Sequence, residues 1–190
     1  MTTFKHLGLA AVIVAACSMT ARADSYNVDM VHSSVSFMIG HAGISNIHGR
    51  FNDYSGTFVI DSADPAKSTF ALSIKVDSVD TGNRKRDDHL QADDYFDVKK
   101  FPTIDFVSTK VTPFDGGYDV AGNLTIHGVT QPIEMKLIGG TRTVEFPKGT
   151  QRVGVVTSLS LKRSEFGMKT ALGSLGDDVN IHIGLEAAKP

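Results

Sequence analysis

Apolar and polar residues alternate with a period of two through most of this chain, and this pattern restricts the possible folds more than any other feature. The clearest case is the segment 70–77, FALSIKVD, in which every second residue is a large apolar one. The same pattern recurs in segments 35–39, 104–106, 118–126, 133–137, 153–161 and 179–185. Because successive side chains of a strand point to opposite faces, each segment predicts a β-strand with one apolar face.

Short turn sequences separate these strands. Residues 113–117 (PFDGG) are typical of a hairpin connection, and further turns are expected at 40–43, 48–49, 127–132, 139–140 and 147–149. The result is about eight strands, which bury one apolar face best by closing into an antiparallel barrel or by folding into a sandwich. An eight-stranded barrel is either filled by side chains or holds one small ligand. The length of the strands and the absence of Trp favour a cavity, although the pattern leaves a solid core open.

One highly charged stretch interrupts the strands, namely residues 82–97, GNRKRDDHLQADDYFD. Asn83 is a suitable N-cap for a short helix over residues 84–92, and Asp93 can cap one further turn. The stretch holds too few apolar residues for a core helix: Leu90, Ala92, Tyr95 and Phe96. We expect it to lie across one end of the sheet structure as a short helical lid, with these apolar residues facing inward.

The N-terminus has the features of an export signal. Lys5 forms a basic start, residues 7–16 are an uninterrupted apolar run, and residues 21–23 (ARA) are a cleavage site of the small-x-small type. Ten apolar residues are too few for a permanent membrane span. We therefore expect residues 1–23 to be a removed signal peptide and residues 24–190 to form a single domain. Residues 14–17 (VAAC) also resemble a lipoprotein box, and the alternative is a protein anchored through a lipidated Cys17.

Composition excludes several classes of function. The chain has 19 Lys and Arg against 21 Asp and Glu, and removal of the signal peptide takes away two of the basic residues, Lys5 and Arg22. A net acidic domain argues against nucleic acid as a partner. The mature chain would contain no cysteine, which excludes disulfides and thiolate chemistry, so its core alone must hold the fold together.

Several segments, in the same order, resemble the YceI family of exported bacterial proteins. They are 37–51 (FMIGHAGISNIHGRF), 79–81 (VDT), 86–90 (RDDHL), 94–97 (DYFD), 101–106 (FPTIDF), 122–130 (GNLTIHGVT) and 163–168 (RSEFGM). The resemblance covers essentially all of residues 24–187. Two departures are Tyr95, where the family usually has Phe, and Lys162, where Asn is more usual. Neither affects the apolar strand faces.

The resemblance implies a lipocalin-like, eight-stranded antiparallel β-barrel whose apolar bore holds a long amphiphile. The implied ligands are polyisoprenoids, such as an isoprenoid quinone or a prenyl phosphate, or a fatty acid or amide. The resemblance also implies a periplasmic or secreted location and a homodimer. The family shares no established catalytic residue set, so no catalytic site transfers to this chain, and no cofactor other than the bound lipid is expected.

The residue pattern adds candidate ligand contacts to this picture. The apolar bore is predicted to comprise Phe37, Ile39, Phe58, Leu72, Ile74, Phe106, Leu124, Ile126, Leu159 and Ile181. Candidate contacts for a polar head group are Arg84, Arg86 and His89 in the lid, with His41 and His48 in turns. Arginine can donate two parallel hydrogen bonds to a phosphate or carboxylate. The alternative for Arg86 is a salt bridge with Asp87, Asp93 or Asp94 that only fixes the lid.

Metal binding and catalysis are weaker hypotheses. His89 and Asp93 are four residues apart, on one face of a helix, but the sequence has no HxH or HxxxH pair, so we expect no metal site. The crowded carboxylates Asp87, Asp88, Asp93 and Asp94 with His89 are the basis of the alternative function, a weak lipid hydrolase or isomerase. No nucleophile elbow or phosphate-binding glycine loop accompanies them, and we expect a protein that is not an enzyme.

Overall fold

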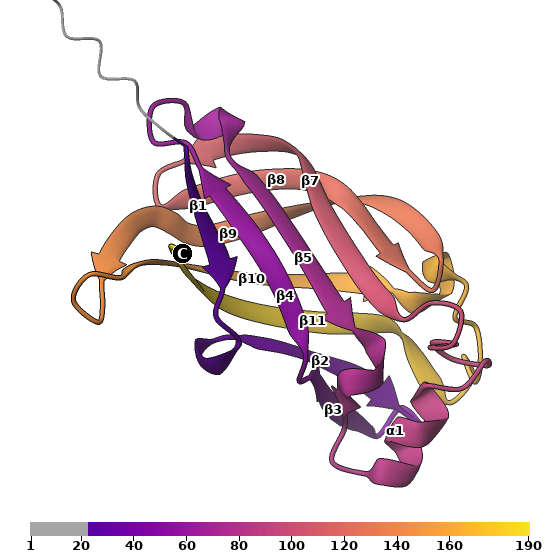
Figure 1. Cartoon of the computed structure of the whole chain (residues 1–190). Coiled ribbons are helices and arrows are strands. Elements are labelled where there is room, and N and C mark those ends of the chain that lie inside the picture. Colours follow the sequence, from indigo (N-terminus) through magenta and orange to yellow (C-terminus); the bar gives the residue numbers. More distant parts are fainter. Residues whose placement is uncertain (1–22) are drawn as a thin grey trace, which may run out of the picture.

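The strands of the chain close into an antiparallel β-barrel, as Figure 1 shows for a computed structural model that describes residues 23–190. Residues 1–22 of the predicted signal peptide, Cys17 among them, lie outside these described residues. The strands are β1 (Asp24–Val28), β2 (Ser34–His41), β3 (Ser45–Phe51), β4 (Tyr54–Ile60), β5 (Thr69–Lys75), β6 (Val79–Asp80), β7 (Thr103–Phe114), β8 (Gly117–Ile126), β9 (Val129–Glu145), β10 (Gln151–Lys162) and β11 (Leu175–Ala188). The helices are α1 (Arg84–Leu90) and the 3-10 turns η1 (Met30–His32), η2 (Pro65–Lys67), η3 (Val76–Ser78) and η4 (Arg163–Phe166).

The eleven strand segments of residues 23–190 form an eight-stranded barrel, because three of the barrel strands are each made of two segments: β1 with β2, β3 with β4, and β5 with β6. β1 and β2 both pair with β11, and β1 pairs in turn with β4 while β2 pairs with β3. β4 pairs with β5, and β3 pairs with the short β6. The remaining order, β5-β7-β8-β9-β10-β11, follows the chain. The barrel and short helical lid predicted from the sequence are thus confirmed, and closure leaves few unpaired strand edges.

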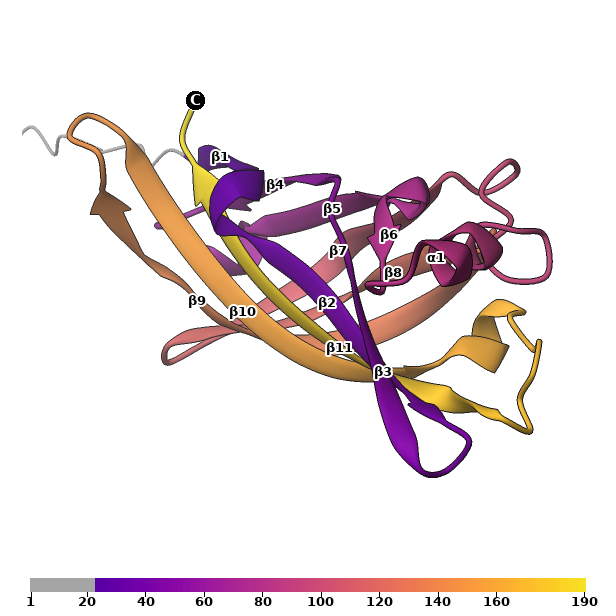
Figure 2. The same cartoon turned by 90° about the horizontal axis from the view of Figure 1, so that it is seen from below.

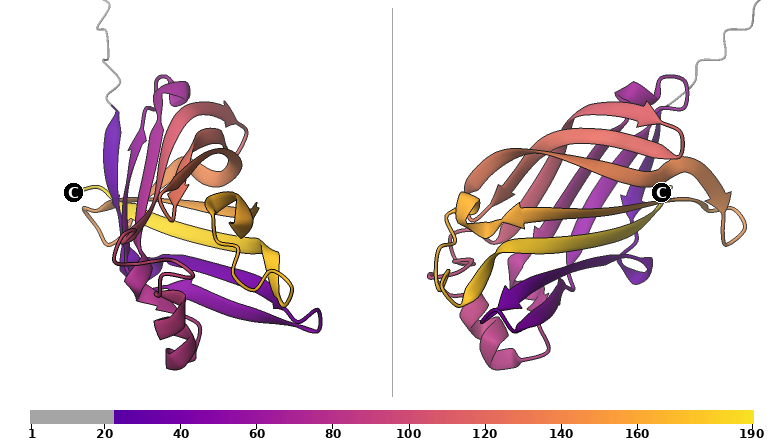
Figure 3. Two further views of the ribbon diagram at one scale, coloured as in Figure 1. Left: turned by 90° about the vertical axis from the view of Figure 1, so that its right-hand side faces the viewer. Right: turned by 180° about the vertical axis from the view of Figure 1, so that it is seen from behind.

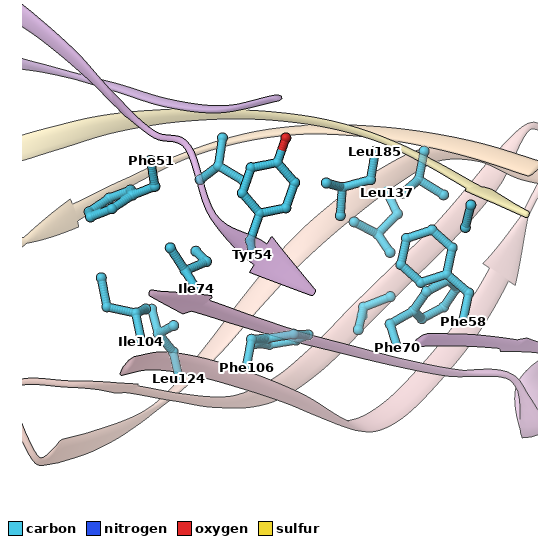
Figure 4. Packing of buried hydrophobic residues seen from close by; sticks show 14 of the residues in the cluster. Phe51, Tyr54, Phe58, Phe70, Ile74, Ile104, Phe106, Leu124, Leu137 and Leu185 are labelled. Atoms are coloured by element: carbon cyan, nitrogen blue, oxygen red, sulfur yellow. The ribbon is translucent and has the colours of Figure 1, made fainter. Parts of the chain in front are cut away.

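The period-two pattern places one residue set inside this barrel. Figure 4 shows buried side chains of several strands converging on its interior, with Phe58 and Phe70 together at one end of the cluster and Phe51 toward the other. The rows of alternating residues therefore face the same interior, because neighbouring strands are in register across the sheet, for example Phe58 with Phe70 and Ile74 with Ile104.

Two expected turns are instead parts of strands. Residues 48–49 lie inside β3, where Gly49 pairs with Phe37, and a Cβ on Gly49 would lie 2.3 Å from the Phe37 ring. Glycine is therefore required there by the close approach of an aromatic side chain. Gly139 and Gly140 have positive φ angles but do not end β9, which continues to Glu145. Figure 2 shows the β9–β10 hairpin projecting beyond the rest of the barrel as a result.

The charged stretch lies at one end of the barrel, as predicted. Helix α1 ends at Leu90, two residues earlier than expected, and the Asn83 side chain caps it by accepting a hydrogen bond from the Arg86 backbone N–H at 3.1 Å. Beyond Leu90 the chain forms hydrogen-bonded turns rather than a second helical turn capped by Asp93. Figure 3 shows α1 at the same end as the connection between β10 and β11. None of the helices in residues 23–190 has the length and apolar character that a membrane span requires.

Candidate functional site: an apolar bore closed at its base

A cavity of about 430 Å³ occupies the interior of the barrel. All ten side chains predicted for the bore line it, and they come from β2, β4, β5, β7, β8, β10 and β11. Volumes of this size are typical of small-molecule binding sites, which are mostly apolar and carry few polar groups. We call the end near Phe58 and Phe70 the base and the end near α1 the mouth.

Aromatic rings close the base. The ring centroids of Phe58 and Phe70 are 5.4 Å apart, and Phe70 lies 5.4 Å from Tyr118. Phe58 and Phe70 line the cavity, whereas Tyr118 and Tyr26 do not and lie behind them. Burial raises the pKa of both tyrosine hydroxyls, and the Tyr118 hydroxyl donates a hydrogen bond to the Gly140 carbonyl at 3.3 Å. The base is therefore a continuous apolar wall.

The lid covers the mouth through a few apolar side chains. Leu90, Tyr95 and Phe96 line the cavity. Phe96 packs edge-on against Phe51 of β3 at 6.0 Å, and Phe51 in turn packs against Phe37 of β2 at 5.6 Å. One edge of β3 pairs with β2. Along its other edge, only Arg50 and Phe51 have a strand partner within the described chain, the short β6. The lid therefore covers the part of the wall where the strand pairing is least complete.

The structure brings three of the five head-group candidates to the cavity. His41, Arg86 and His89 line it at the mouth, whereas His48 and Arg84 are exposed and are not among the lining residues of the described chain. His48 pairs with Met38 on β2 and alternates with the inward Ile47 and Gly49, which explains its outward position. The first turn of α1 leaves Arg84 in solvent.

Arg86 does not form the salt bridge with a lid carboxylate that was the alternative interpretation. Its Nε donates to the Thr81 hydroxyl at 2.7 Å, and its Nη2 donates to the Thr81 carbonyl at 2.7 Å. The Asp87 carboxylate accepts from the Thr81 backbone N–H and hydroxyl instead. Thr81 thus joins Arg86 and Asp87, and Arg86 both fastens the start of the lid and lines the cavity.

His89 contacts Asp94 rather than Asp93. Its Nε2 lies 3.0 Å from the Asp94 carboxylate, and its ring packs edge-on against Tyr95 at 4.9 Å. None of the five lid carboxylates, Asp87, Asp88, Asp93, Asp94 and Asp97, lines the cavity within residues 23–190, although His89 does. Of the groups named for acid or base catalysis, His89 is the one that lines the cavity, with the Asp94 carboxylate within hydrogen-bond distance of it.

The pattern analysis missed the other wall of the mouth, residues 163–174, which we call the mouth loop. The Arg163 side chain is 5% exposed and donates to four backbone carbonyls, those of Met168, Thr170, Leu175 and Gly176. Arg163 also lines the cavity. The sequence did offer one indication of this residue. Arg163 continues the inward-facing row that ends at Leu161, and a charged residue in a row of apolar side chains is unusual.

Polar contacts connect the mouth loop to the neighbouring segments. The Thr170 hydroxyl donates to the Asp94 carbonyl of the lid at 2.6 Å, and the Ala42 backbone N–H, at the β2–β3 tip, donates to the Ser174 carbonyl at 2.6 Å. The Asp177 carboxylate accepts from the backbone N–H and hydroxyl of Ser164, and these hydrogen bonds lower its pKa. Individual hydrogen bonds therefore join the loops of the mouth to one another, beside the packing of Phe96 on Phe51.

A cluster of possible metal ligands lies away from the bore. Within residues 23–190, Asp29, His32 and Glu186 bring three ligand atoms within 4.8 Å of one another. Arg152 already donates to both carboxylates, at 2.6 Å for Asp29 and 2.5 Å for Glu186. This guanidinium holds the pKa of Asp29 well below its usual range, and it compensates the charge that a cation would otherwise need to neutralise.

Comparison with known proteins identifies the family. The model of the YceI-like domain matches residues 26–187. The chain belongs to the YceI-like family. It is 36% identical over 187 residues to a UPF0312 protein of Pectobacterium atrosepticum, with 96% of each chain covered, and 38% identical over 173 residues to one of Pseudomonas aeruginosa, with 89% of each covered.

Solved structures share the YceI-like barrel. The crystal structure of BcnA from Burkholderia cenocepacia has a TM-score of 0.73 at 28% identity, covering 84% of this chain and 99% of BcnA. The YceI protein of Campylobacter jejuni has a TM-score of 0.70 at 34% identity, covering 77% of this chain and 87% of that protein. A polyisoprenoid binding domain from Saccharophagus degradans shares the fold at 19% identity, with a TM-score of 0.66, covering 87% and 98%.

Proposed function

We propose that this protein binds a long-chain amphiphile without chemical turnover and holds the apolar chain of that ligand in the bore. The observation that carries the proposal is a cavity of about 430 Å³, walled by apolar side chains from most of the barrel strands and closed at its base by Phe58 and Phe70. Such a shape fits one flexible chain inserted from the mouth better than it fits a compact polar substrate.

The hydrophobic effect supplies the affinity. Each buried methylene contributes about 0.8 kcal/mol, so a sixteen-carbon chain gains on the order of 12 kcal/mol before losses. Ordering the chain and immobilising the ligand offset part of this gain. The ligand classes that suit the bore are polyisoprenoids, such as isoprenoid quinones or prenyl phosphates, and fatty acids or amides. Polyisoprenoids are also the class that the Saccharophagus degradans domain is named for.

Polar groups at the mouth would orient such a ligand. His41, Arg86 and His89 line the cavity there, and Arg163 adds a buried positive charge to the same end. A phosphate, carboxylate or carbonyl at this end would find hydrogen-bond donors, which the apolar base does not offer. We propose, in addition, that the protein acts after export as a periplasmic or secreted carrier or sequestering protein, and that it assembles as a homodimer.

Mass spectrometry of an organic extract tests the proposal, using protein purified without detergent from its native host. We expect one lipid class, at near-stoichiometric amount. The Leu124→Arg variant should lose this lipid, because it places an unpaired charge in the bore. Leu124 is 7% exposed and lines the cavity.

The matched control is Asn123→Arg, which adds the same charge at the exposed neighbouring position of β8. This variant should retain the lipid, and its circular dichroism should match that of the wild type. Equal lipid content in Leu124→Arg and wild-type protein, with both folded, would place the lipid outside the bore and contradict the proposal. Ile74→Arg gives an independent test from β5, the strand between β4 and β7.

A further inference from the structure

A single polar residue interrupts the apolar inward row of β10. That row consists of Val153, Val155, Thr157, Leu159 and Leu161. The inward rows of the neighbouring strands β9 and β11 are apolar at the corresponding cavity-lining positions, which are Ile133, Met135, Leu137, Val179, Ile181, Ile183 and Leu185. Thr157 is therefore a polar residue among inward side chains that are otherwise apolar on β10 and at the cavity-lining positions of both neighbouring strands.

Within the part of the chain that the structure describes, the hydroxyl of Thr157 has no hydrogen-bond partner. Its side-chain oxygen is buried and makes no hydrogen bond within residues 23–190, and the residue is only 5% exposed while lining the cavity. Every other buried side-chain nitrogen or oxygen of the described chain has a hydrogen-bond partner. Leaving a buried hydroxyl unpaired costs about 1 to 3 kcal/mol, and because this oxygen has almost no accessible surface, a ligand in the bore can bond to it only after the side chain turns about its Cα–Cβ bond.

The neighbouring residue Val156, which points outward, shows the reverse of the expected pattern. Val156 is 58% exposed, so at positions 156 and 157 the apolar side chain faces solvent and the polar one faces the bore. Valine has nearly the shape of threonine and is equally suited to a strand, so neither packing nor strand propensity requires a hydroxyl here. A polar residue at a position where the fold favours an apolar one points to a functional site.

The depth of Thr157 restricts the chemistry of its partner. It pairs with Ile183 of β11, and Ile183 pairs with Val35 of β2, so its cross-strand neighbours are apolar. It lies five residues from the end of β10 at Lys162, about 16 Å along the strand. The positively charged side chains that line the cavity, Arg86 and Arg163, belong to the mouth. A charged group beside Thr157 would be buried without a counter-ion, whereas a neutral one needs only the single hydroxyl.

We propose that Thr157 is a specificity-determining residue that hydrogen-bonds a neutral carbonyl or hydroxyl oxygen of the ligand inside the bore. The inference rests on the proposed function, because it assumes a chain in the cavity. It narrows the ligand classes named above to lipids with a neutral polar group at this depth, such as quinones, esters, amides and alcohols. A lipid whose polar group is a phosphate or carboxylate would use the mouth and gain nothing from Thr157.

Chain-matched probes test this assignment. Dodecane, 2-dodecanone and 6-dodecanone differ in the presence and position of one carbonyl, and their affinities can be measured by displacement of the fluorescent apolar probe 1-aminoanthracene. Wild-type protein should bind at least one ketone about fivefold to tenfold more tightly than dodecane. In Thr157→Val this preference should fall to about onefold with dodecane affinity unchanged or higher, and Thr157→Ser should keep the preference.

The outcomes separate this inference from the proposed function. Equal affinity of wild type for all three probes, or a ketone preference that survives in Thr157→Val, would overturn the role of Thr157 while leaving chain binding intact. Failure of wild type to bind any of the probes would overturn both. The ligand-free Thr157→Val protein should melt at the wild-type temperature or above it, because no protein hydrogen bond is lost. A fall of several degrees would show a structural role and contradict the assignment.

Discussion

Phe58, Phe70 and Tyr118 close the base of the bore by ring packing, whereas at the mouth the lid and the mouth loop are joined to each other by a hydrogen bond. The base belongs to β4, β5 and β8, each of which pairs with a strand on both sides, and opening it would expose several aromatic rings together. The mouth consists of the lid and the mouth loop, joined by single bonds such as that from Thr170 to the Asp94 carbonyl. Each such bond has a modest net free energy, so the mouth can open locally while the base stays closed.

Because the two ends differ, we expect a ligand to enter the bore at the mouth and to stop at the base. A chain can pass the mouth when a few hydrogen bonds break, and the base then sets how far it goes. Local opening belongs to the low-stability parts of a fold, and ligand-binding lids are drawn from those parts.

The largest expected effect is on the base. Phe70→Ala removes a 3%-exposed ring that touches Phe58 and Tyr118, and it should lower the free energy of unfolding by about 3 to 5 kcal/mol. Phe96→Ala at the mouth, where the ring is half-buried against Phe51, should cost only about 1 to 2 kcal/mol. Urea unfolding measures both, and equal losses would contradict the distinction between a packed base and a loosely held mouth.

Arg163→Met should loosen the mouth without unfolding the barrel. Four backbone carbonyls lose their guanidinium donor, so amide hydrogen exchange in residues 167–176 should become at least tenfold faster. Amides of β10 and of the base should keep their protection.

Arg152→Met is the matched control for this variant. Arg152 is also largely buried and bonds to Asp29, Glu186 and the Phe146 carbonyl, away from the mouth. It should leave exchange in residues 167–176 unchanged. Faster exchange there in both variants would mean that the mouth is not an independent unit.

A smaller effect is expected from the bond that joins the lid to the mouth loop. Thr170→Val removes the hydroxyl that donates to the Asp94 carbonyl, and the rate of lipid release should rise about fivefold with little change in melting temperature. Stopped-flow transfer of a fluorescent fatty acid to vesicles measures the rate. Thr109→Val removes a comparable hydroxyl-to-carbonyl bond, to Ala121 on the barrel wall, and should not change the release rate.

The smallest effect concerns pH. Hydrogen bonds from Ser164 lower the pKa of Asp177, so its contribution to stability is present above its unfolded pKa of about 3.9 and is lost as the pH falls through the lower folded value. Wild type should therefore melt above Asp177→Asn at neutral pH, and the difference should shrink as the pH drops below about 4. A difference that is constant down to pH 2, measured by thermal unfolding, would show that the carboxylate charge is not responsible.

Much of the barrel and its interior could be predicted because a strand has an exact repeat. Phe37, Leu72 and Leu124 follow the period-two rule, and each of them lines the cavity. Alternation fixes which face a residue takes, and closure then turns that face inward. Tertiary contacts explain the failures: Gly49 was interpreted as a turn residue, but its missing Cβ makes room for the Phe37 ring.

The residues missed at the bore share a physical cause. Arg163 and Thr157 are polar residues on apolar rows, so a pattern based on hydrophobicity passes over them. Their roles depend on partners distant in the sequence, since Arg163 bonds to carbonyls as far away as Gly176. The contacts of His89 with Asp94 and of Arg86 with Thr81 were likewise not predictable, because several carboxylates and hydroxyls lie within reach of each side chain.

The central claim is that an amphiphile lies inside the barrel between mouth and base. Methyl NMR during titration with hexadecanamide tests it most directly. Methyl groups at the base (Val155 and Leu185) and at the mouth (Leu90 and Leu175) should shift and show contacts to the chain, while the outward methyls of Val107 and Val156 should not change. Shifts confined to the outward methyls, with the inward ones unchanged, would contradict the account.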